Sequence, residues 1–259
     1  MTLDGRTVVI TGASSGLGAE AVRLLGERGA TVHAVGRDAE RTRRVGGRHA
    51  YTVDFARLDD VRRLATELRA RLDHIDVLAA NAGAVVPRGV TADGIDAVFQ
   101  VNAIGPWLLT TLLADRLRGG RVLATNSRSH RGAVIGDVPA LAEGRPPLPG
   151  HRAYARAKLA AGILLREFGR RHPDVDVGDF HAGILATDFG RYLGERTGRA
   201  AKTAARPFLG SPADGAACLV ALAERDTPLA GGHHTRARPA RGAEQLYSPD
   251  LGRDLWPPT

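Results

Sequence analysis

A tyrosine and a lysine four positions apart carry the clearest chemical signal in the sequence. Tyr154 and Lys158 stand near the start of the stretch 153–171, whose apolar residues recur at helical spacing. Residues four apart share one face of a helix, so the phenol and the ammonium group lie side by side. A neighbouring cation favours the phenolate and lowers the tyrosine pKa from its reference of about 10. Such a phenol can exchange a proton with a carbonyl or alcohol oxygen. Taken alone, the pair is more typical of the polar surface of an amphipathic helix.

A glycine-rich turn supplies a second signal. The segment 11–18 is Thr-Gly-Ala-Ser-Ser-Gly-Leu-Gly, and it lies between the apolar run 6–11 and the helical pattern 15–27. Glycines let the backbone approach a pyrophosphate closely, and the N-terminus of a helix attracts that anion. The same glycines could form only a tight turn, but the place between strand and helix favours an anion site. The residues expected to contact the pyrophosphate are Gly12, Ser14, Ser15, Gly16, Leu17 and Gly18.

These residues must be held by alternating strands and helices. Such alternation forces parallel strands with helices on both faces, and right-handed crossovers then give a doubly wound, Rossmann-type α/β sheet in three layers. We expect one domain over residues 1–259, with a loop at 130–150 and a flap at 188–207 that closes over bound ligand. Both segments follow strand carboxyl ends, where open α/β sheets bind ligands. The predicted strands are 6–11, 31–35, 49–53, 76–80, 121–125, 175–181 and 232–235, and the predicted helices are 15–27, 58–72, 95–117, 153–171 and 212–222.

The composition excludes several classes of protein. Of the 259 residues, 43% are hydrophobic, which is enough for a substantial core, and no run of eighteen apolar residues predicts a membrane span. The single cysteine, Cys218, cannot form an internal disulfide, and no signal-peptide pattern stands at the N-terminus, so we expect a cytoplasmic protein. The net charge is +8, but the arginines are spread along the chain and aromatics are only 5%. This pattern favours solvated arginine-rich faces over a nucleic-acid partner.

Taken in order, the landmarks resemble the short-chain dehydrogenase/reductase family over about residues 5–235. The resemblance implies that Asn102, Ser127, Tyr154 and Lys158 form a catalytic tetrad. It also implies that Asp54, with Phe55 beside it, contacts adenine. The remaining cofactor contacts that it implies are Asn81, Ala82 and Gly83 after the fourth strand, and Gly183, Ile184 and Thr187 after the sixth, with Thr187 holding the nicotinamide amide.

The sequence departs from the family pattern at two strand ends. The usual Pro-Gly after the sixth strand is Ala182-Gly183, and the usual Ser-Ser after the fifth is Asn126-Ser127. A second serine, Ser129, leaves open which hydroxyl contacts the substrate oxygen. The long segment between Ser127 and Tyr154 resembles the retinol-dehydrogenase and protochlorophyllide-reductase branch of the family, without making retinol the substrate.

The end of the second strand indicates the cofactor. Family members that use NAD usually have an aspartate there, which bonds the ribose 2′-hydroxyl, whereas this chain has Gly36 followed by Arg37. An acid would repel the 2′-phosphate of NADP, while an arginine can pair with it bidentately. The sequence therefore predicts NADP(H), although an arginine at a strand end can also be merely exposed.

The resemblance implies reversible reduction of a carbonyl on a small organic substrate, and the arginine- and alanine-rich composition suggests a role in secondary metabolism. Tyr154 would give the proton, Lys158 would lower its pKa and hold the nicotinamide ribose, Ser127 would bond the substrate oxygen, and Asn102 would fix a water. Two alternatives are a non-redox epimerase or dehydratase on the same scaffold, and a catalytically silent NADP-sensing regulator. The first usually has a different glycine turn, and the second typically lacks the tyrosine or the lysine.

The remaining expectations concern substrate, metal and assembly. The pair His233-His234 lacks further ligands at a fixed spacing, so we expect a surface edge strand there and no metal site. We expect a homo-oligomer, either a dimer or a tetramer. The residues expected to contact the substrate are Ser129, His130, Phe189 and Tyr192.

Overall fold

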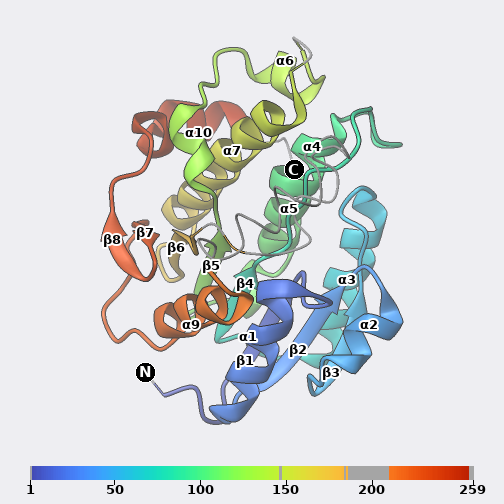
Figure 1. Ribbon diagram of the computed structural model, residues 1–259, viewed down its shortest axis with the longest axis vertical. Helices are drawn as coiled ribbons and strands as arrows, with labels where there is room; N and C mark the ends of the chain where they lie inside the picture. Colours follow the sequence, from blue (N-terminus) through green and yellow to red (C-terminus); the bar gives the residue numbers. More distant parts are fainter. Residues whose placement is uncertain (1, 146–147, 184, 186–209, 257–259) are drawn as a thin grey trace.

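The computed structural model describes residues 2–145, 148–183, 185 and 210–256. Over these residues the chain forms an α/β/α sandwich, which confirms the predicted fold class (Figure 1). The strands are β1 (Thr7–Thr11), β2 (Thr31–Gly36), β3 (His49–Thr52), β4 (Val77–Ala80), β5 (Arg121–Thr125), β6 (Asp176–His181), β7 (His233–Thr235) and β8 (Arg238–Ala240). The helices are α1 (Gly16–Glu27), α2 (Ala39–Arg44), α3 (Leu58–Arg71), α4 (Ala97–Phe99), α5 (Gly105–Leu112), α6 (Val138–Ala142), α7 (Gly150–Arg171), α9 (Pro212–Ala223) and α10 (Pro249–Leu255).

The strands lie in the order β3-β2-β1-β4-β5-β6-β7-β8, and every neighbouring pair is parallel except β7 with β8. The chain reverses direction across the sheet at β1 and β4, so their carboxyl ends open a crevice for ligands. Successive side chains of a strand face opposite layers. Val8 and Ile10 pack with α1 and α9, whereas Val9 packs with α3 and α5. A continuous apolar strand is therefore buried on both faces, as in parallel sheets generally.

The predicted helix 95–117 is not continuous. It consists of α4, a π-helical turn at Gln100–Ile104, α5, and a 3-10 turn at Ala114–Arg116. Apolar periodicity alone could not distinguish a regular helix from one with a wider turn. Single π turns inside α-helices are frequent at functional sites, and this one contains Asn102.

Three other expectations need correction. The predicted loop 130–150 contains α6, which Asp137 caps by accepting a bond from the Ala140 N–H. The short helices α2 and α10 and the strand β8 were not predicted, because each is too short to show a clear period. Since β8 covers β7, His233 and His234 are not on a surface edge strand, and both are buried.

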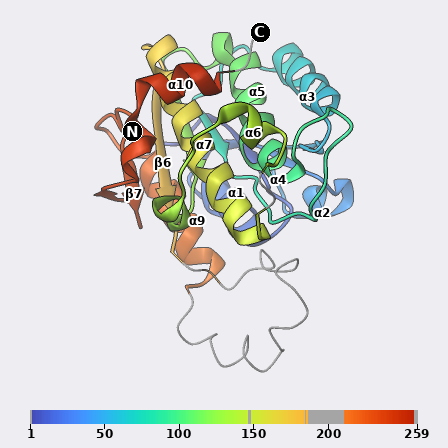
Figure 2. The ribbon, with the colours of Figure 1, turned by 90° about the horizontal axis from the view of Figure 1, so that it is seen from above.

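The C-terminal end of the described chain packs across α7. Figure 2 shows α10 lying beside α7, and Trp256, which directly follows α10, meets Trp107 of α5 edge-on with ring centres 5.2 Å apart. The guanidinium of Arg171 stacks on the same Trp256 ring at 4.5 Å. No described helix is both long enough and apolar enough to cross a bilayer.

Candidate active site

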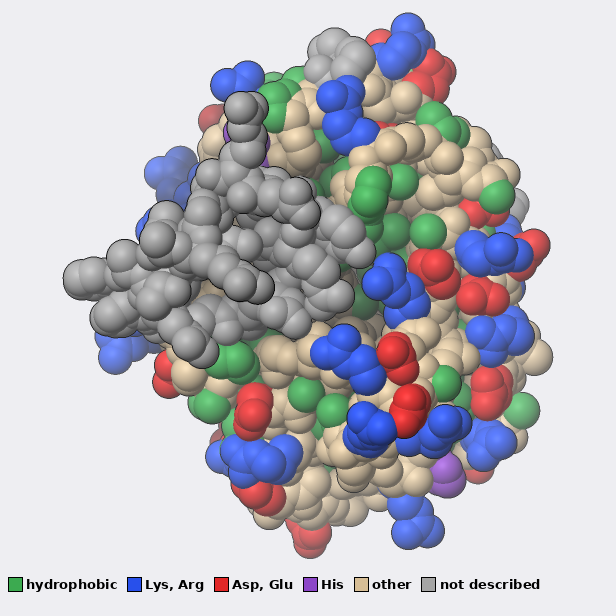
Figure 3. Space-filling model, turned by 45° about the vertical axis from the view of Figure 1, so that its right-hand side comes forward, with side chains coloured by type: hydrophobic (Ala, Val, Ile, Leu, Met, Phe, Trp, Pro, Cys, Tyr) green, Lys and Arg blue, Asp and Glu red, His purple; other side chains and the backbone are tan. Residues whose placement is uncertain are grey.

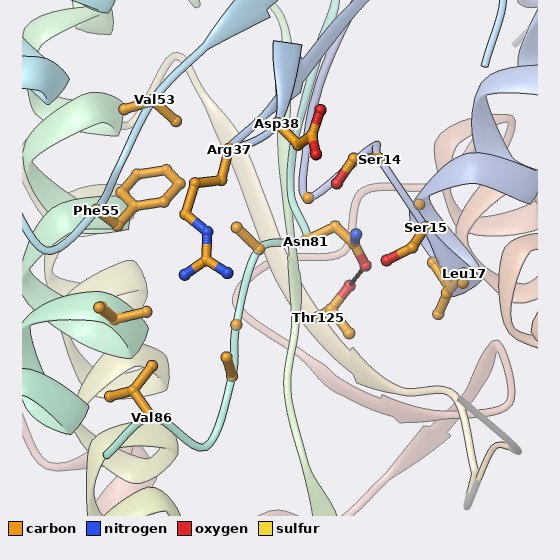
Figure 4. Close-up of a pocket in the computed structure, with 18 of the residues that line it drawn as sticks. Ser14, Ser15, Leu17, Arg37, Asp38, Val53, Phe55, Asn81, Val86 and Thr125 are labelled. Carbon is orange, nitrogen blue, oxygen red and sulfur yellow. Dashed lines mark hydrogen bonds between the residues drawn. The ribbon is translucent and has the colours of Figure 1, made fainter. Parts of the chain in front are cut away.

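A cavity of about 1210 Å³ opens at the carboxyl ends of the central strands. Every described residue that the sequence predicted to contact a cofactor lines it, whereas Ile184 and Thr187 lie outside the described residues. Figure 4 shows side chains from several strand ends converging on this space. The lining residues from the prediction are Gly12, Ser14, Ser15, Gly16, Leu17, Gly18, Arg37, Asp54, Phe55, Asn81, Ala82, Gly83, Tyr154, Lys158 and Gly183.

The glycine turn is a close-packed cradle in front of α1. Gly12 has φ +68°, and a Cβ there would lie 2.9 Å from the Cα of Ala82. A Cβ on Gly18 would lie 2.1 Å from the carbonyl oxygen of Gly12. The first turn of α1 has no acidic residue, and its N-cap Ser15 makes no side-chain cap bond. The free backbone N–H groups and the positive end of the helix dipole therefore suit a phosphate group.

Asn81 ties three strand ends together beneath this cradle. Its Nδ2 donates to the Thr11 carbonyl at 3.0 Å, and its Oδ1 accepts from Thr125 Oγ1 at 2.9 Å (Figure 4). Thr11 Oγ1 in turn accepts from the N–H groups of Asn81 and Ala82. Sequence reasoning missed both threonines. Their signal was a hydroxyl at the last position of a buried strand, where an apolar residue would have continued the pattern.

Arg37 lines the cavity at the same end as Phe55 (Figure 4). A side chain at Gly36 would crowd α2, because a Cβ there would lie 2.2 Å from Thr42 Oγ1 and the threonine would have to shift. The neighbouring Asp38 caps α2 by accepting the Arg41 N–H at 3.0 Å, so its carboxylate is already engaged. The unpredicted helix α2 also brings Arg41 and Arg43 to the cavity lining.

Tyr154 and Ser127 stand together at the cavity. Tyr154 is buried, the Ser127 hydroxyl interacts with its hydroxyl, and both residues line the cavity. Ser129 is exposed and does not line the cavity; its Oγ instead donates to Ser127 Oγ at 2.9 Å. The geometry thus brings Ser127 together with Tyr154 and places Ser129 behind it.

Burial changes the proton affinity of the tyrosine and the lysine in opposite ways. Desolvation raises the pKa of Tyr154 despite its bond from Ser127, so the lowering expected from Lys158 is wrong for the cofactor-free protein. Lys158 Nζ lies 5.8 Å from the centre of the Tyr154 ring and donates to the Thr125 carbonyl at 2.9 Å. Desolvation lowers the pKa of Lys158 to about 8, because the charge of Asp179 offsets only part of the burial cost.

Asn102 holds the segment that follows β4 rather than lining the main cavity. Its Nδ2 donates to the carbonyl of Ala84 at 2.7 Å, and its Oδ1 accepts from the Ala84 N–H at 3.0 Å. A Cβ on Gly83 would lie 2.9 Å from Lys158 Nζ and 3.0 Å from Asn102 Oδ1. The two side chains therefore meet at this glycine, and the π turn places Asn102 there.

Comparison with known proteins decides the family. The family described as short chain dehydrogenase matches residues 6–197. The chain belongs to this family.

A Streptomyces protein (strain C5), described as a daunorubicin C-13 ketoreductase, is 38% identical over 98% of this chain and 91% of its own length. Human retinol dehydrogenase 13 is 28% identical over 98% of this chain and 83% of its own. The solved structure of BdcA in complex with NADPH superposes with a TM-score of 0.67, at 26% identity over 94% of this chain and 97% of that one. The resemblance to the retinol-dehydrogenase branch is thereby confirmed.

In this short-chain dehydrogenase, neither of the two described residues that were expected to contact the substrate, Ser129 and His130, lines the cavity. His130 is fully buried, its Nδ1 bonds the Ser127 carbonyl at 2.5 Å, and it does not line the cavity. Nor does any other described residue of the loop 130–150. The loop folds back through the 3-10 turn Arg128–Gly132, which takes His130 into the interior. The flap 188–207, with Phe189 and Tyr192, lies outside the described residues.

The surface charge of this short-chain dehydrogenase is broken up. On the face shown in Figure 3, basic and acidic side chains alternate around the hollow. Several arginines pair with acids one helical turn away, as Arg23 does with Glu27 and Arg44 with Glu40. On this face, basic side chains are therefore mixed with acidic ones and do not form a uniformly positive surface.

The position of Lys158 predicts a pH-dependent stability. Its folded pKa of about 8 lies below its ordinary value, so between these two values the unfolded chain binds more protons. Stability therefore rises with pH in that window. From pH 7 to pH 10, wild type should gain on the order of 1–3 kcal/mol relative to Lys158→Met, which cannot titrate there. Urea unfolding of both cofactor-free proteins at the two pH values measures this difference. A difference that does not change with pH would contradict the burial of a titrating lysine.

Proposed function

We propose that this protein is an NADPH-dependent ketoreductase that acts on an organic ketone. The observation that carries the proposal is the meeting of three side chains at one cavity. Buried Tyr154 lies there with Ser127, whose hydroxyl interacts with the phenol, and with Lys158, whose Nζ lies 5.8 Å from the centre of the Tyr154 ring. Two hydroxyl groups at one point of a cavity can both bond a single carbonyl oxygen. Substrate binding there would place that oxygen within reach of a proton donor.

Each side chain would have a distinct role in reduction. The raised pKa keeps Tyr154 protonated near neutral pH, so it can donate its proton to the substrate oxygen as negative charge develops there. Ser127 would donate a second hydrogen bond to the same oxygen. Lys158, when protonated, would stabilise the phenolate that remains. NADPH, when bound, supplies the hydride to the carbonyl carbon.

The described residues fit such a cofactor. The cradle at Gly12 and Gly18 admits a pyrophosphate against the N-terminus of α1, and side chains there would block it. Arg37 would pair with the 2′-phosphate, and Arg41 and Arg43 line the same end of the cavity. The NADPH bound in the BdcA structure supports this choice of cofactor.

Arg37→Asp should shift cofactor preference from NADPH towards NADH. The change removes a cation and places an acid near the ribose 2′ position. We expect the NADPH to NADH affinity ratio to fall by about 10- to 150-fold, the value of one charged hydrogen bond. Fluorescence titration of both cofactors measures the ratio. Arg48→Asp is the matched control, because it changes the net charge equally at an exposed residue outside the cavity lining. A ratio equal to that of the control would rule out Arg37 as the phosphate contact.

The cavity wall indicates the substrate class. Ala84, Val86, Pro87, Ala97 and Val101 give an apolar lining next to the glycine-rich ligand site. An apolar wall in the same cavity as the Ser127 and Tyr154 hydroxyls suits a bulky ketone with few charges. The similarity to a daunorubicin C-13 ketoreductase supports a ketone on a secondary metabolite as the substrate.

Oxidation of NADPH, followed by its absorbance, tests the proposal. The panel should contain daunorubicin, simple aromatic ketones, the aldehyde retinal and a sugar nucleotide, with NADH as the control cofactor. Turnover with a ketone supports the proposal. Tight NADPH binding without oxidation by any member of the panel would instead indicate the regulator, and change of a sugar nucleotide without net redox would indicate the epimerase or dehydratase. Action in the cytoplasm and assembly into a dimer or tetramer remain parts of the proposal, to be checked by fractionation and light scattering.

A further inference from the structure

A buried ionic cluster lies directly behind the serine. Asp179 is fully buried in β6, and its Oδ1 accepts from Arg166 Nη2 of α7 at 2.8 Å and lies 3.3 Å from His233 Nδ1 of β7. Arg166 is itself buried and also donates to the Gly162 carbonyl at 2.8 Å. Charged residues are almost never fully buried without a partner, and Asp179 has partners on two neighbouring elements, α7 and β7.

Asn126 links this cluster to the catalytic loop. Its Nδ2 donates to Asp179 Oδ2, and its Oδ1 accepts the Ser127 N–H at 2.8 Å. Its own backbone N–H donates to the Phe180 carbonyl at 2.7 Å. A serine, which the family pattern has at this position, lacks a second polar atom to bridge both partners.

The charge of Asp179 fixes which way the amide of Asn126 points. Burial alone would raise the pKa of Asp179, but the charge of Arg166 and the bond from His233 outweigh it, so the pKa is well below its usual range. An ionised carboxylate can only accept hydrogen bonds. The amide nitrogen of Asn126 must therefore face Asp179, which turns its oxygen towards Ser127.

We propose that Asp179 and Asn126 are positioning residues that hold Ser127 in place for the proton transfer by Tyr154. The proposal rests on the reductase function proposed above. The chain Arg166–Asp179–Asn126–Ser127 connects α7, β6 and the end of β5, so the serine backbone is fixed from the core and not only by its own loop. This link would keep the Ser127 hydroxyl in a single position relative to Tyr154, with which it interacts.

Asn126→Ala tests the link with two readouts. The Ser127 N–H loses its acceptor, so its amide hydrogen exchange in the cofactor-free protein should become faster. With an accepted ketone, kcat should fall by about 10- to 100-fold while the NADPH Kd changes less than about twofold. The exchange measurement does not depend on activity. If no ketone is reduced, the proposed function fails, and amide exchange still decides whether the link exists.

Asn126→Asp adds a pH signature that a purely structural role would not give. The introduced carboxyl, when protonated, can donate to Asp179 and accept from the Ser127 N–H, as the amide does. On ionisation it loses the donor and repels Asp179, so kcat should be near wild type at low pH and fall as pH rises. The titratable and charged groups around Asp179 and Ser127 are Arg166, Lys158, His233 and His130, and they are the same in both proteins. The ratio of variant to wild-type kcat therefore isolates the introduced group.

Asp179→Asn and Asp176→Asn form a matched pair on one strand. Asp176 pairs with Arg121 at 2.7 Å and accepts the Leu229 and Ala230 N–H groups, far from Ser127. Asp179→Asn should lower kcat as Asn126→Ala does, whereas Asp176→Asn should lower only the unfolding midpoint. If Asp179→Asn does not fold, Asn126→Ala and Asn126→Asp decide the question. Equal kcat in wild type and Asn126→Ala, unchanged Ser127 exchange, or a pH-independent Asn126→Asp ratio would overturn the proposal.

Discussion

Tyr154→Phe should abolish ketone reduction and leave NADPH binding nearly intact. The ring remains in its apolar cluster with Val85 and Val98, so only the hydroxyl group, which interacts with Ser127, is lost. General acid catalysis is worth about 10²–10⁴-fold, and we expect kcat to fall within this range. Steady-state rates with an accepted ketone, together with a fluorescence titration of NADPH, measure both effects.

The control for this change is Tyr247→Phe. Tyr247→Phe also removes a hydroxyl group, one that accepts a hydrogen bond from the Gly242 N–H. Tyr247, however, stands in the C-terminal segment and does not line the cavity. Its removal should leave kcat unchanged. More than a tenth of wild-type activity in Tyr154→Phe would show that another group supplies the proton.

Gly18→Ala should weaken NADPH binding by about 100-fold or more, because two or more phosphate hydrogen bonds depend on the cradle. A methyl group at this position would lie 2.1 Å from the Gly12 carbonyl oxygen and 2.8 Å from Asn81 Nδ2, so the turn must open. Overpacking of this kind also costs about 1–3 kcal/mol of folding free energy. Isothermal titration with NADPH and urea unfolding measure the two losses.

Gly26→Ala is the matched control on the same helix. Nothing lies within 4 Å of a Cβ built there, so alanine should fit and stabilise α1 by about 0.5–1 kcal/mol. NADPH affinity should not change. If both substitutions affected binding alike, the effect would come from altered helix stability and not from the cradle.

Most of the fold and much of the site could be predicted from regular apolar periodicity and short sequence motifs. The order of strands and helices followed from apolar runs, and the glycine turn, Asn81, Arg37 and Tyr154 all line one cavity as expected. These residues were predictable because the carboxyl ends of parallel strands meet at one edge of the sheet, so local sequence position fixes their place in space.

The remaining parts depend on contacts between segments that the sequence does not bring together. An aspartate within an apolar strand gives no sign of its partner, and the pairing of Asp179 with Arg166 of α7 and His233 of β7 is visible only in the fold. His130 follows the serine closely in sequence, yet a 3-10 turn directs it into the interior. The raised pKa of Tyr154 likewise results from burial, which the spacing of Tyr154 and Lys158 does not reveal.

The contact between Trp107 of α5 and Trp256 provides an intrinsic fluorescence probe of the C-terminal segment. Trp107 and Trp256 are the two tryptophans of the sequence, and their rings meet edge-on at this contact. Intrinsic fluorescence at 295 nm excitation will therefore follow the separation of the C-terminal segment from α5, whereas far-UV circular dichroism averages over the whole backbone. A fluorescence transition that precedes the dichroism transition would show that this end of the chain detaches while the sheet is still folded.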